Sequence, residues 1–262
     1  MKAMILCGGQ GTRLREYTEI RPKPMVEIGG HPILWHIMKL YAHHGINDFI
    51  LCLGYKSQVI KEYFLNYEAM NSDFTVELGS SSRIHYHGSS HGENGWKVTL
   101  VETGDATMTG ARIARAAKYL GDSPETFCVT YGDGVSDLDL KMALAFHRKH
   151  KKLATLTGVR PPSRFGELEI SGSSVVSFSE KPQLGQGAIN GGFFFFEPAF
   201  LRYLSDDPTV HLERAPLEQC ARDNQLSVYE HQGFWQSMDT YRDWESLDRQ
   251  WQAGKAPWKV WS

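Results

Sequence analysis

The chain has 262 residues, 41% of them hydrophobic, and a formal net charge of −2 at pH 7. That length can bury the core of one large α/β domain, and the small negative charge excludes the global basic field that nucleic acid or anionic lipid would need. No apolar run reaches the length of a membrane span and no secretory leader precedes the first glycines. We therefore expect a cytoplasmic protein with neither a nucleic-acid nor a membrane partner.

Short apolar runs alternate with helical patterns along the chain. The predicted strands are Met4–Cys7, Phe49–Leu53, Phe74–Leu78, Thr126–Tyr131, Ala154–Val159 and Gly191–Phe196. The predicted helices are Pro32–His44, Ser57–Tyr67, Gly110–Leu120 and Leu138–His150. Alternation of this kind predicts a doubly wound, mostly parallel sheet flanked by helices, and strands that are apolar throughout fit a sheet covered on both faces. We expect one domain over residues 1–262.

The cysteines give no sign of a metal site or a disulfide framework. Cys7, Cys52, Cys128 and Cys220 form no C-x-x-C pair, and the first three lie in short apolar runs. Such residues are typical of buried free thiols in a reducing compartment.

The stretch Gly79–Asn94, GSSSRIHYHGSSHGEN, is rich in Ser, Gly and His and has little periodicity. It predicts a long exposed loop. His85, His87 and His91 have no matching cysteine or carboxylate ligands nearby in the sequence, so a solvated or interface loop is favoured over a metal site.

The chain becomes helical and rich in tryptophan from about residue 209 to residue 262. The tryptophans of this segment are Trp235, Trp244, Trp251, Trp258 and Trp261. Large apolar anchors of this kind favour packing back on the domain or onto another subunit over an aromatic ligand platform.

The glycine cluster after the first predicted strand indicates an anion site. Gly8, Gly9 and Gly11 would let backbone N–H groups approach a phosphate, and Arg13 adds a charged fork. The cluster has no Gly-Lys pair, as a Walker A motif requires, and it lacks the third glycine of the dinucleotide fingerprint. The glycines alone are equally compatible with a simple turn.

Lys23 favours the phosphate interpretation. Pro22 and Pro24 flank it, stiffen the backbone and remove local N–H donors. A lysine held in this way is better explained as a second phosphate contact than as a solvated surface charge.

These residues belong to a longer pattern. GGxGTRL followed by RPKPMVEIGGHPIL resembles the N-terminal signature of the sugar-1-phosphate nucleotidyltransferases. Further motifs, in order, resemble the cytidylyl-transferring branch of that family: WKVTLVETGDATMTGARI (96–113), YGDGVSDLD (131–139), FGELEI (165–170), FSEKP (178–182), INGGFFFFEP (189–198) and GFWQSMDT (233–240). The match covers nearly the whole chain. It implies a Rossmann-like fold with a mostly parallel mixed sheet and a helical C-terminal tail.

The resemblance also implies a reaction and its residues. The substrates would be CTP and glucose 1-phosphate, the cofactor Mg²⁺, and the assembly a homo-oligomer. Catalytic roles would fall to Arg13, Lys23 and Asp133. Nucleotide contacts would come from Leu6, Gly8, Gly9, Gly11, Thr12, Arg13, Lys23, Thr103, Gly104, Thr109, Gly110, Arg112 and Gly132. Sugar-phosphate contacts would come from Gly166, Glu180, Lys181, Asn190, Gly191 and Trp235. Asp133 and Asp239 would hold the metal.

Two of these residues have a competing structural interpretation. By local sequence Asp239 is a good N-cap for a helix over Thr240–Trp251, and only the resemblance favours a metal ligand. Core packing is as good an interpretation of Trp235 as a wall of the sugar site.

Other functions remain open on sequence alone. Asp137-Leu138-Asp139 matches the D-x-D metal motif of nucleotide-sugar glycosyltransferases, but these two acidic residues also suit the start of the following helix. A non-catalytic sensor would be expected to lose Arg13, Lys23 or Asp133. Within the family, UTP, dTTP, ATP or GTP could replace CTP, and a glucose analogue could replace glucose, because base and sugar choice depend on a few pocket contacts.

Overall fold

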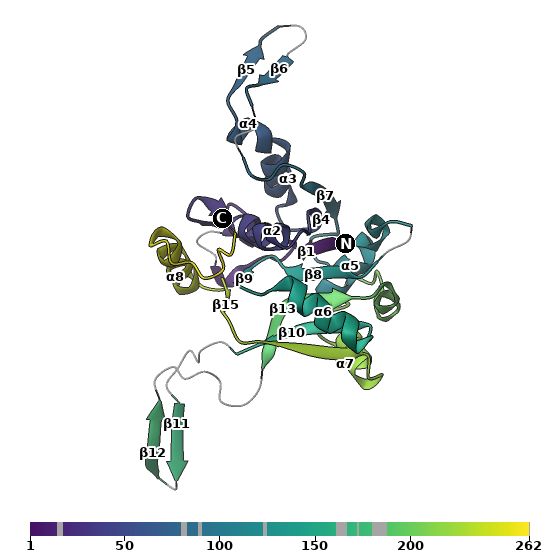
Figure 1. Ribbon diagram of the computed structural model, residues 1–262, viewed down its shortest axis with the longest axis vertical. Helices are drawn as coiled ribbons and strands as arrows, with labels where there is room; N and C mark the ends of the chain where they lie inside the picture. Colours follow the sequence, from purple (N-terminus) through teal and green to yellow (C-terminus); the bar gives the residue numbers. More distant parts are fainter. Residues whose placement is uncertain are drawn as a thin grey trace.

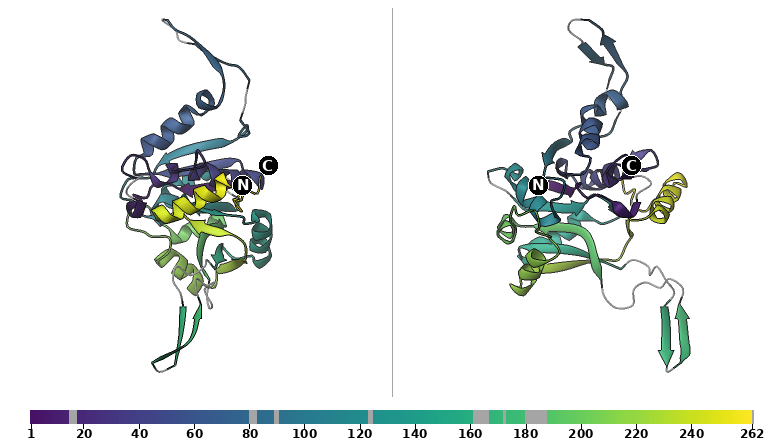
Figure 2. Two further views of the ribbon diagram at one scale, coloured as in Figure 1. Left: turned by 90° about the vertical axis from the view of Figure 1, so that its left-hand side faces the viewer. Right: turned by 180° about the vertical axis from the view of Figure 1, so that it is seen from behind.

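A computed structural model describes residues 1–14, 18–79, 83–88, 91–122, 125–160, 167–171, 173–179 and 188–261. Figure 1 shows a central body built on a twisted sheet, from which a helical arm ending in a hairpin projects on one side and a second hairpin on the other. The two further views show both hairpins standing clear of the body (Figure 2). No helix in these described ranges is long and apolar enough to cross a membrane.

A seven-stranded mixed sheet forms the body, and its strand order is β14-β10-β13-β8-β1-β4-β7. Its strands are β1 (Lys2–Leu6), β4 (Asp48–Leu53), β7 (Lys97–Glu102), β8 (Phe127–Tyr131), β10 (Ala154–Val159), β13 (Ile189–Phe196) and β14 (Leu226–His231). β1 runs parallel to both β4 and β8, and only β13 is antiparallel to its neighbours. The predicted α/β fold with a mostly parallel sheet is confirmed.

Both faces of the sheet are covered, as the uninterrupted apolar strands predicted. Along β1, Ala3 and Ile5 point into one core with helices α2 (Ile33–His43) and α6 (Leu140–His150). Met4 and Leu6 point into the other core. That second core is covered by α5 (Thr109–Ala116), η3 (Ala117–Leu120), η4 (Pro198–Tyr203) and α7 (Ala215–Arg222).

The C-terminal segment packs back on its own domain. α8 (Tyr241–Gln252) lies beside the short pair β2 (Glu27–Ile28) and β3 (His31–Pro32). Trp258 and Trp261 are buried, and the Trp251 ring lies over Gly29, which has a φ of +61° and no room for a Cβ. Of the two predicted uses of the tryptophans, packing on the domain is confirmed for these rings.

The arm confirms one prediction and contradicts another. The expected strand Phe74–Leu78 is present as a strand, although it lies outside the central sheet, whereas the expected loop Gly79–Asn94 contains a strand. β5 (Phe74–Glu77) pairs antiparallel with β6 (Arg83–Tyr86) in a separate hairpin, beyond α3 (Ser57–Leu65) and α4 (Tyr67–Asn71). Phe74 and Tyr86 lie opposite each other, and such cross-strand aromatic pairs stabilise isolated hairpins.

The remaining short elements are η1 (Thr12–Leu14), η2 (Lys23–Met25), β9 (Gly134–Ser136), β11 (Glu167–Ser171), β12 (Ser174–Ser179) and β15 (Trp235–Ser237). β15 pairs with β9, which brings the C-terminal segment beside the end of β8. All four cysteines are buried and free, as predicted, and burial raises the pKa of the Cys52 thiol to about 12.

Candidate active site

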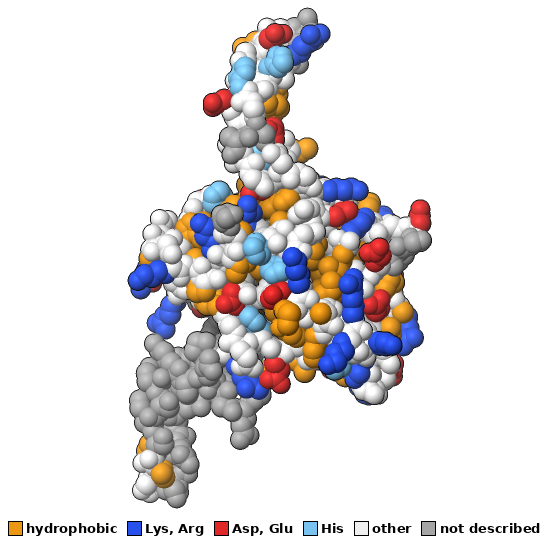
Figure 3. Space-filling view, viewed as in Figure 1, with side chains coloured by type: hydrophobic (Ala, Val, Ile, Leu, Met, Phe, Trp, Pro, Cys, Tyr) orange, Lys and Arg blue, Asp and Glu red, His pale blue; other side chains and the backbone are white. Residues whose placement is uncertain are grey.

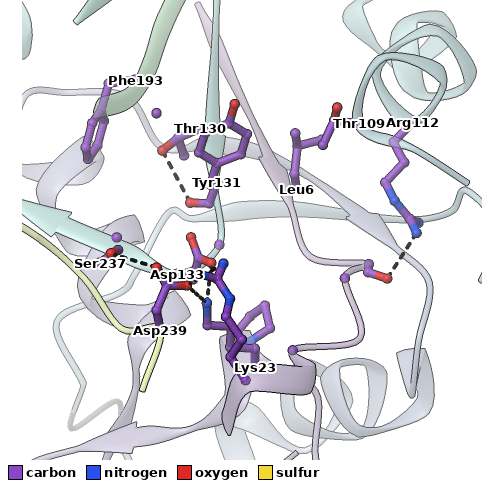
Figure 4. Close-up of a pocket in the computed structure, with 18 of the residues that line it drawn as sticks. Leu6, Lys23, Thr109, Arg112, Thr130, Tyr131, Asp133, Phe193, Ser237 and Asp239 are labelled. Atoms are coloured by element: carbon purple, nitrogen blue, oxygen red, sulfur yellow. Dashed lines mark hydrogen bonds and ion pairs between the residues drawn. The ribbon is translucent and has the colours of Figure 1, made fainter. Parts of the chain in front are cut away.

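A cavity of about 460 Å³ lies at the carboxyl ends of β1 and β8. This is the edge at which open α/β sheets bind ligands. Predicted site residues that line it are Leu6, Gly8, Gly9, Gly11, Thr12, Arg13, Lys23, Thr109, Arg112, Gly132, Asp133, Gly191, Trp235 and Asp239. Figure 4 shows how several of these side chains converge.

The glycine loop is held against the sheet by contacts that only small residues permit. The Gly8 carbonyl accepts hydrogen bonds from the Tyr55 N–H and from Arg112, and a Cβ at Gly8 would lie 2.0 Å from an Arg112 nitrogen. Gly11 has a φ of +61°, a conformation that favours glycine. Gly9 is exposed, with open space around its Cα. The loop therefore has room for an anion beside Gly9.

Arg112 supports this loop from below. Its guanidinium is buried and donates to the Leu53 carbonyl (2.8 Å), the Thr103 hydroxyl (2.7 Å) and the Gly8 carbonyl (3.0 Å). These partners are neutral oxygens, so the positive charge is not cancelled by them, although burial lowers the pKa of Arg112. The charge stays beneath the glycine loop, where it favours an anion.

Three other predicted nucleotide residues lie outside the cavity, and one of them, Thr103, bonds Arg112. Thr103 lies under the cavity with Arg112, and Gly104, with a φ of +96°, packs against Thr107. The N–H of Gly110 donates to the Val210 carbonyl at 3.0 Å. Thr103, Gly104 and Gly110 are not lining residues of the cavity.

Lys23 connects the two predicted metal carboxylates. Its Nζ lies 2.6 Å from Oδ2 of Asp133 and 2.7 Å from Oδ1 of Asp239, and its side chain is only 10% exposed. Burial by itself would lower the pKa of Lys23, but the attraction of Asp133 and hydrogen bonds to both carboxylates raise it. The ammonium is therefore a fixed positive charge at the floor of the cavity.

The two carboxylates come from distant segments. Asp133 follows β8 through Gly132, whose N–H donates to the Leu6 carbonyl and whose Cα leaves no space for a side chain. Asp239 follows β15 and also pairs with Arg13 at 3.1 Å. Burial opposes ionisation of Asp239, yet hydrogen bonding and attraction to Lys23, with a further attraction to Arg13, lower its pKa.

The capping interpretation of Asp239 is wrong. Thr240 is the N-cap of α8, and it forms a reciprocal capping box with Asp243. The Asp239 N–H donates to Asp243, while the Asp239 carboxylate does not cap the helix and accepts from Lys23. The described residues contain no group of three or more His, Cys, Asp or Glu side chains suited to a metal. Asp133 and Asp239 are the pair that could share a divalent cation with ligand oxygens.

The D-x-D pair has a structural role. The Asp139 carboxylate accepts hydrogen bonds from the N–H groups of Lys141 and Met142 and caps α6. Asp137 pairs with His231 at 2.9 Å. Neither carboxylate lines the cavity, so the helix-capping interpretation of Asp139 is confirmed.

The opposite wall carries two of the predicted sugar residues, Gly191 and Trp235. Trp235 donates from Nε1 to the Gly191 carbonyl at 2.7 Å and lines the cavity. Asn190 reaches the Tyr131 hydroxyl at 3.2 Å. Gly166, Glu180 and Lys181 lie outside the described residues.

Sequence reasoning missed two residues on this side. The Tyr131 hydroxyl donates to Glu213 at 2.5 Å. Tyr131 ends β8 beside the Gly-Asp motif, and that position could have drawn attention to it. Glu213 lies in an irregular segment before α7, and no local pattern marks it.

Comparisons with known proteins agree with this geometry. A family model described as "Nucleotidyl transferase" matches residues 2–247. The glucose-1-phosphate cytidylyltransferase of Salmonella typhi is 53% identical over 262 residues, which is 100% of each chain. The mannose-1-phosphate guanylyltransferase catalytic subunit beta of Danio rerio is 32% identical over 93% of this chain and 62% of its own.

A solved structure supports the fold. UDP-glucose pyrophosphorylase complexed with UDP-glucose superposes with a TM-score of 0.67 over 97% of this chain and 98% of its own, at 15% sequence identity. At that identity the likeness concerns the fold alone.

Proposed function

The chain belongs to the nucleotidyl transferase family, and we propose that it transfers the cytidylyl group of CTP to α-D-glucose 1-phosphate, forming CDP-glucose and pyrophosphate. The observation that carries this proposal is 53% identity to a glucose-1-phosphate cytidylyltransferase along the full length of both chains. The cavity supports it, because a glycine loop, two cationic side chains and two carboxylates meet there.

The reaction needs positioning and charge more than a base. A phosphate oxygen of glucose 1-phosphate, already anionic, forms a bond to the α-phosphorus of CTP. The bond from that phosphorus to the oxygen bridging the β-phosphate breaks, and pyrophosphate leaves with the electron pair. Since no proton has to move, the barrier lies in bringing two anions together in line.

The chain's own residues would lower that barrier by their positions. The glycine loop would place the triphosphate over the positive charge of Arg112. Arg13, whose side chain is 71% exposed at the mouth of the cavity, would reach the β- and γ-phosphates. Lys23 would turn from the carboxylates toward the α-phosphate or the incoming phosphate.

The donor set at Asp133 and Asp239 fits Mg²⁺. Both are oxygen ligands, and the structure already holds them around a single cation, the Lys23 ammonium. Mg²⁺ in such sites takes one or two carboxylates and completes its shell with phosphate oxygens and water. The metal would supply charge neutralisation between the phosphate groups, and Asp133 and Asp239 would orient it.

Sugar binding is proposed for the wall that Gly191 and Trp235 form, with the exposed Asn190 beside it. Gly166, Glu180 and Lys181, outside the described residues, are proposed as its sugar-phosphate contacts. On this proposal, Lys181→Ala should mainly raise KM for glucose 1-phosphate.

We also propose a cytoplasmic homo-oligomer. The arm exposes some apolar side chains that a monomer would leave in water (Figure 3). Leu65 is 80% exposed and Leu78 is 89% exposed. Another subunit could cover such side chains. Light scattering after size exclusion tests the assembly, and a monomer at working concentration would refute it. The four free thiols fit a reducing compartment.

The test of the function is pyrophosphate release with glucose 1-phosphate and Mg²⁺, run separately with CTP, UTP, dTTP, ATP and GTP. We expect release with CTP. Release with another nucleotide would keep the mechanism and correct the base. If none of the five supports release, glucose 1-phosphate analogues are tested next. If the analogues also give no pyrophosphate release, a binding protein without turnover is favoured.

A further inference from the structure

Glu213 bridges the two sides of the cavity. Its Oε1 accepts the hydrogen bond of the Tyr131 hydroxyl at 2.5 Å, on the sugar side. Its Oε2 accepts that of the Thr109 hydroxyl at 2.7 Å, at the start of α5 on the nucleotide side. Tyr131 and Thr109 line the cavity, whereas Glu213 does not. Glu213 is exposed to solvent outside the cavity, and its carboxylate acts on the cavity wall through two hydroxyl groups.

The bond to Glu213 decides which way the Tyr131 hydroxyl points. A phenol has one proton to donate, and a carboxylate can only accept. With that proton directed at Glu213, the Tyr131 oxygen is left as an acceptor. It already receives one hydrogen bond from Nδ2 of Asn190 at 3.2 Å. Its remaining lone pair can accept from a substrate hydroxyl.

The Asn190 amide has a fixed orientation as well. Its Oδ1 accepts from the Gly192 N–H at 2.9 Å, and an N–H group cannot donate to the amide nitrogen, so Nδ2 must face Tyr131. One of the two Nδ2 protons is used by Tyr131, and the other is a donor beside the Tyr131 acceptor. Gly192 has a φ of +79°, and a Cβ there would lie 2.4 Å from the Tyr131 ring. Glycine at this position therefore lets the backbone beside Asn190 approach the Tyr131 ring closely.

We propose that Glu213 is a positioning residue for the sugar substrate: it directs the Tyr131 proton away from the cavity, so that Tyr131 accepts from a sugar hydroxyl while Asn190 donates to one. This inference rests on the proposed function and names one of the groups that select the hexose. A site that hydrogen-bonds a substrate hydroxyl in this way discriminates against sugars that lack it.

The position of Glu213 suits an indirect role. A carboxylate in direct contact with a phosphate would repel it, but Glu213 does not line the cavity, and its two oxygens accept from the hydroxyl groups of Thr109 and Tyr131. Burial, and then the negative charge of Glu213, raise the pKa of Tyr131, so its phenol keeps the proton that the arrangement requires.

The experiment measures KM for glucose 1-phosphate and for CTP separately, in the full chain. Glu213→Ala should raise KM for glucose 1-phosphate about five-fold, the value of one hydrogen bond, with KM for CTP unchanged. Glu213→Gln keeps an acceptor for Tyr131 and should stay near the wild type. Tyr131→Phe should match Glu213→Ala, and the double variant should be no worse than Tyr131→Phe alone.

A binding measurement separates positioning from general damage. Glu213→Ala should weaken binding of CDP-glucose but not of CDP, since only the first carries the sugar. The control is Glu218→Ala, which removes an exposed carboxylate on α7 that pairs with Arg222, away from the cavity.

Three results would overturn the inference. The first is a KM for glucose 1-phosphate in Glu213→Ala that is no higher than in the control. The others are additive effects of Glu213→Ala and Tyr131→Phe on that KM, or a rise in KM for CTP alone. All require an active wild type. An inactive wild type would instead contradict the proposed function, so the two failures are distinguishable.

Discussion

The ammonium of Lys23 lies 2.6 Å from the carboxylate of Asp133, although 110 residues separate them in the chain. The same ammonium is 2.7 Å from Asp239, so one buried lysine is shared by two carboxylates at the floor of the cavity. Without such a cation the two like charges would repel each other. Lys23 therefore keeps the floor of the cavity assembled, in the place where the proposed metal would have to bind.

Asp133→Asn should abolish metal-dependent turnover and leave the fold intact. The amide is a poor ligand for Mg²⁺, and loss of several kcal/mol of charge stabilisation corresponds to about a thousand-fold or more in kcat. Pyrophosphate release over a Mg²⁺ titration measures the effect. Asp139→Asn is the matched control, because asparagine also caps helices. Near-normal turnover in Asp133→Asn would remove this residue from the metal site.

Lys23→Met should raise the affinity for a divalent ion in the absence of nucleotide, while turnover falls. Removal of the ammonium leaves Asp133 and Asp239 without their shared cation, and we expect binding about ten-fold tighter, which corresponds to 1.4 kcal/mol. Mn²⁺ binding followed by electron paramagnetic resonance is the readout. Lys39→Met, which breaks a pair with Glu93 outside the cavity, is the control. Unchanged or weaker binding would mean that Lys23 does not compete with the metal.

Asp139→Ala should cost stability without costing activity. Loss of an N-cap lowers the free energy of unfolding by about 1 kcal/mol, and Asp139 caps α6 outside the cavity. Urea unfolding measures the first effect, and kcat/KM for pyrophosphate release measures the second. If turnover disappeared while the protein stayed folded, the D-x-D interpretation would be restored.

His36 should make the protein less stable as the pH falls. Burial among tryptophans lowers its pKa to about 4, below the ordinary value of about 6.5. Between these two pH values His36 is protonated in the unfolded chain but stays neutral in the native protein. The stabilisation present above pH ~6.5 is therefore lost as the pH falls toward 4. The loss in the free energy of unfolding is about 3 kcal/mol, since each pKa unit corresponds to about 1.4 kcal/mol.

A variant at this position tests the term. The free energy of unfolding of His36→Gln, measured by urea between pH 7 and 4, should depend on pH less steeply than that of the wild type. His150→Gln, at an exposed site on α6, should follow the wild type. Parallel curves for His36→Gln and the wild type would show that His36 is not the group responsible.

The elements that the sequence predicted well are those whose signal is local. β1, β4, β8, β10 and β13 are buried on both faces, so their apolar runs stand out. The pattern missed β7 and β14, which are the two edge strands of the sheet. An edge strand is only partly covered, its side chains are mixed, and its partner is set by the rest of the sheet.

The same distinction applies to the active site. The glycine loop and the proline-flanked Lys23 could be recognised from short stretches, because adjacent residues determine their backbone conformation. In the arm, the strand β5 was predicted but its partner β6 was taken for a loop, since the pairing of β5 with β6 is a cross-strand contact that single residues do not reveal.

The sequence by itself determined the fold class, the glycine loop and the phosphate-directed residues near the N-terminus, because glycine, proline and apolar periodicity act over a few residues. Only the tertiary structure decided that Thr240, and not Asp239, caps α8, and that Asp239 contacts Lys23. The contact between Glu213 and Tyr131 was likewise visible only in the structure. Those contacts depend on strand order and on the return of the C-terminal segment along β9 and β15. Such long-range placement follows from packing of the whole chain around its sheet, which no local preference encodes.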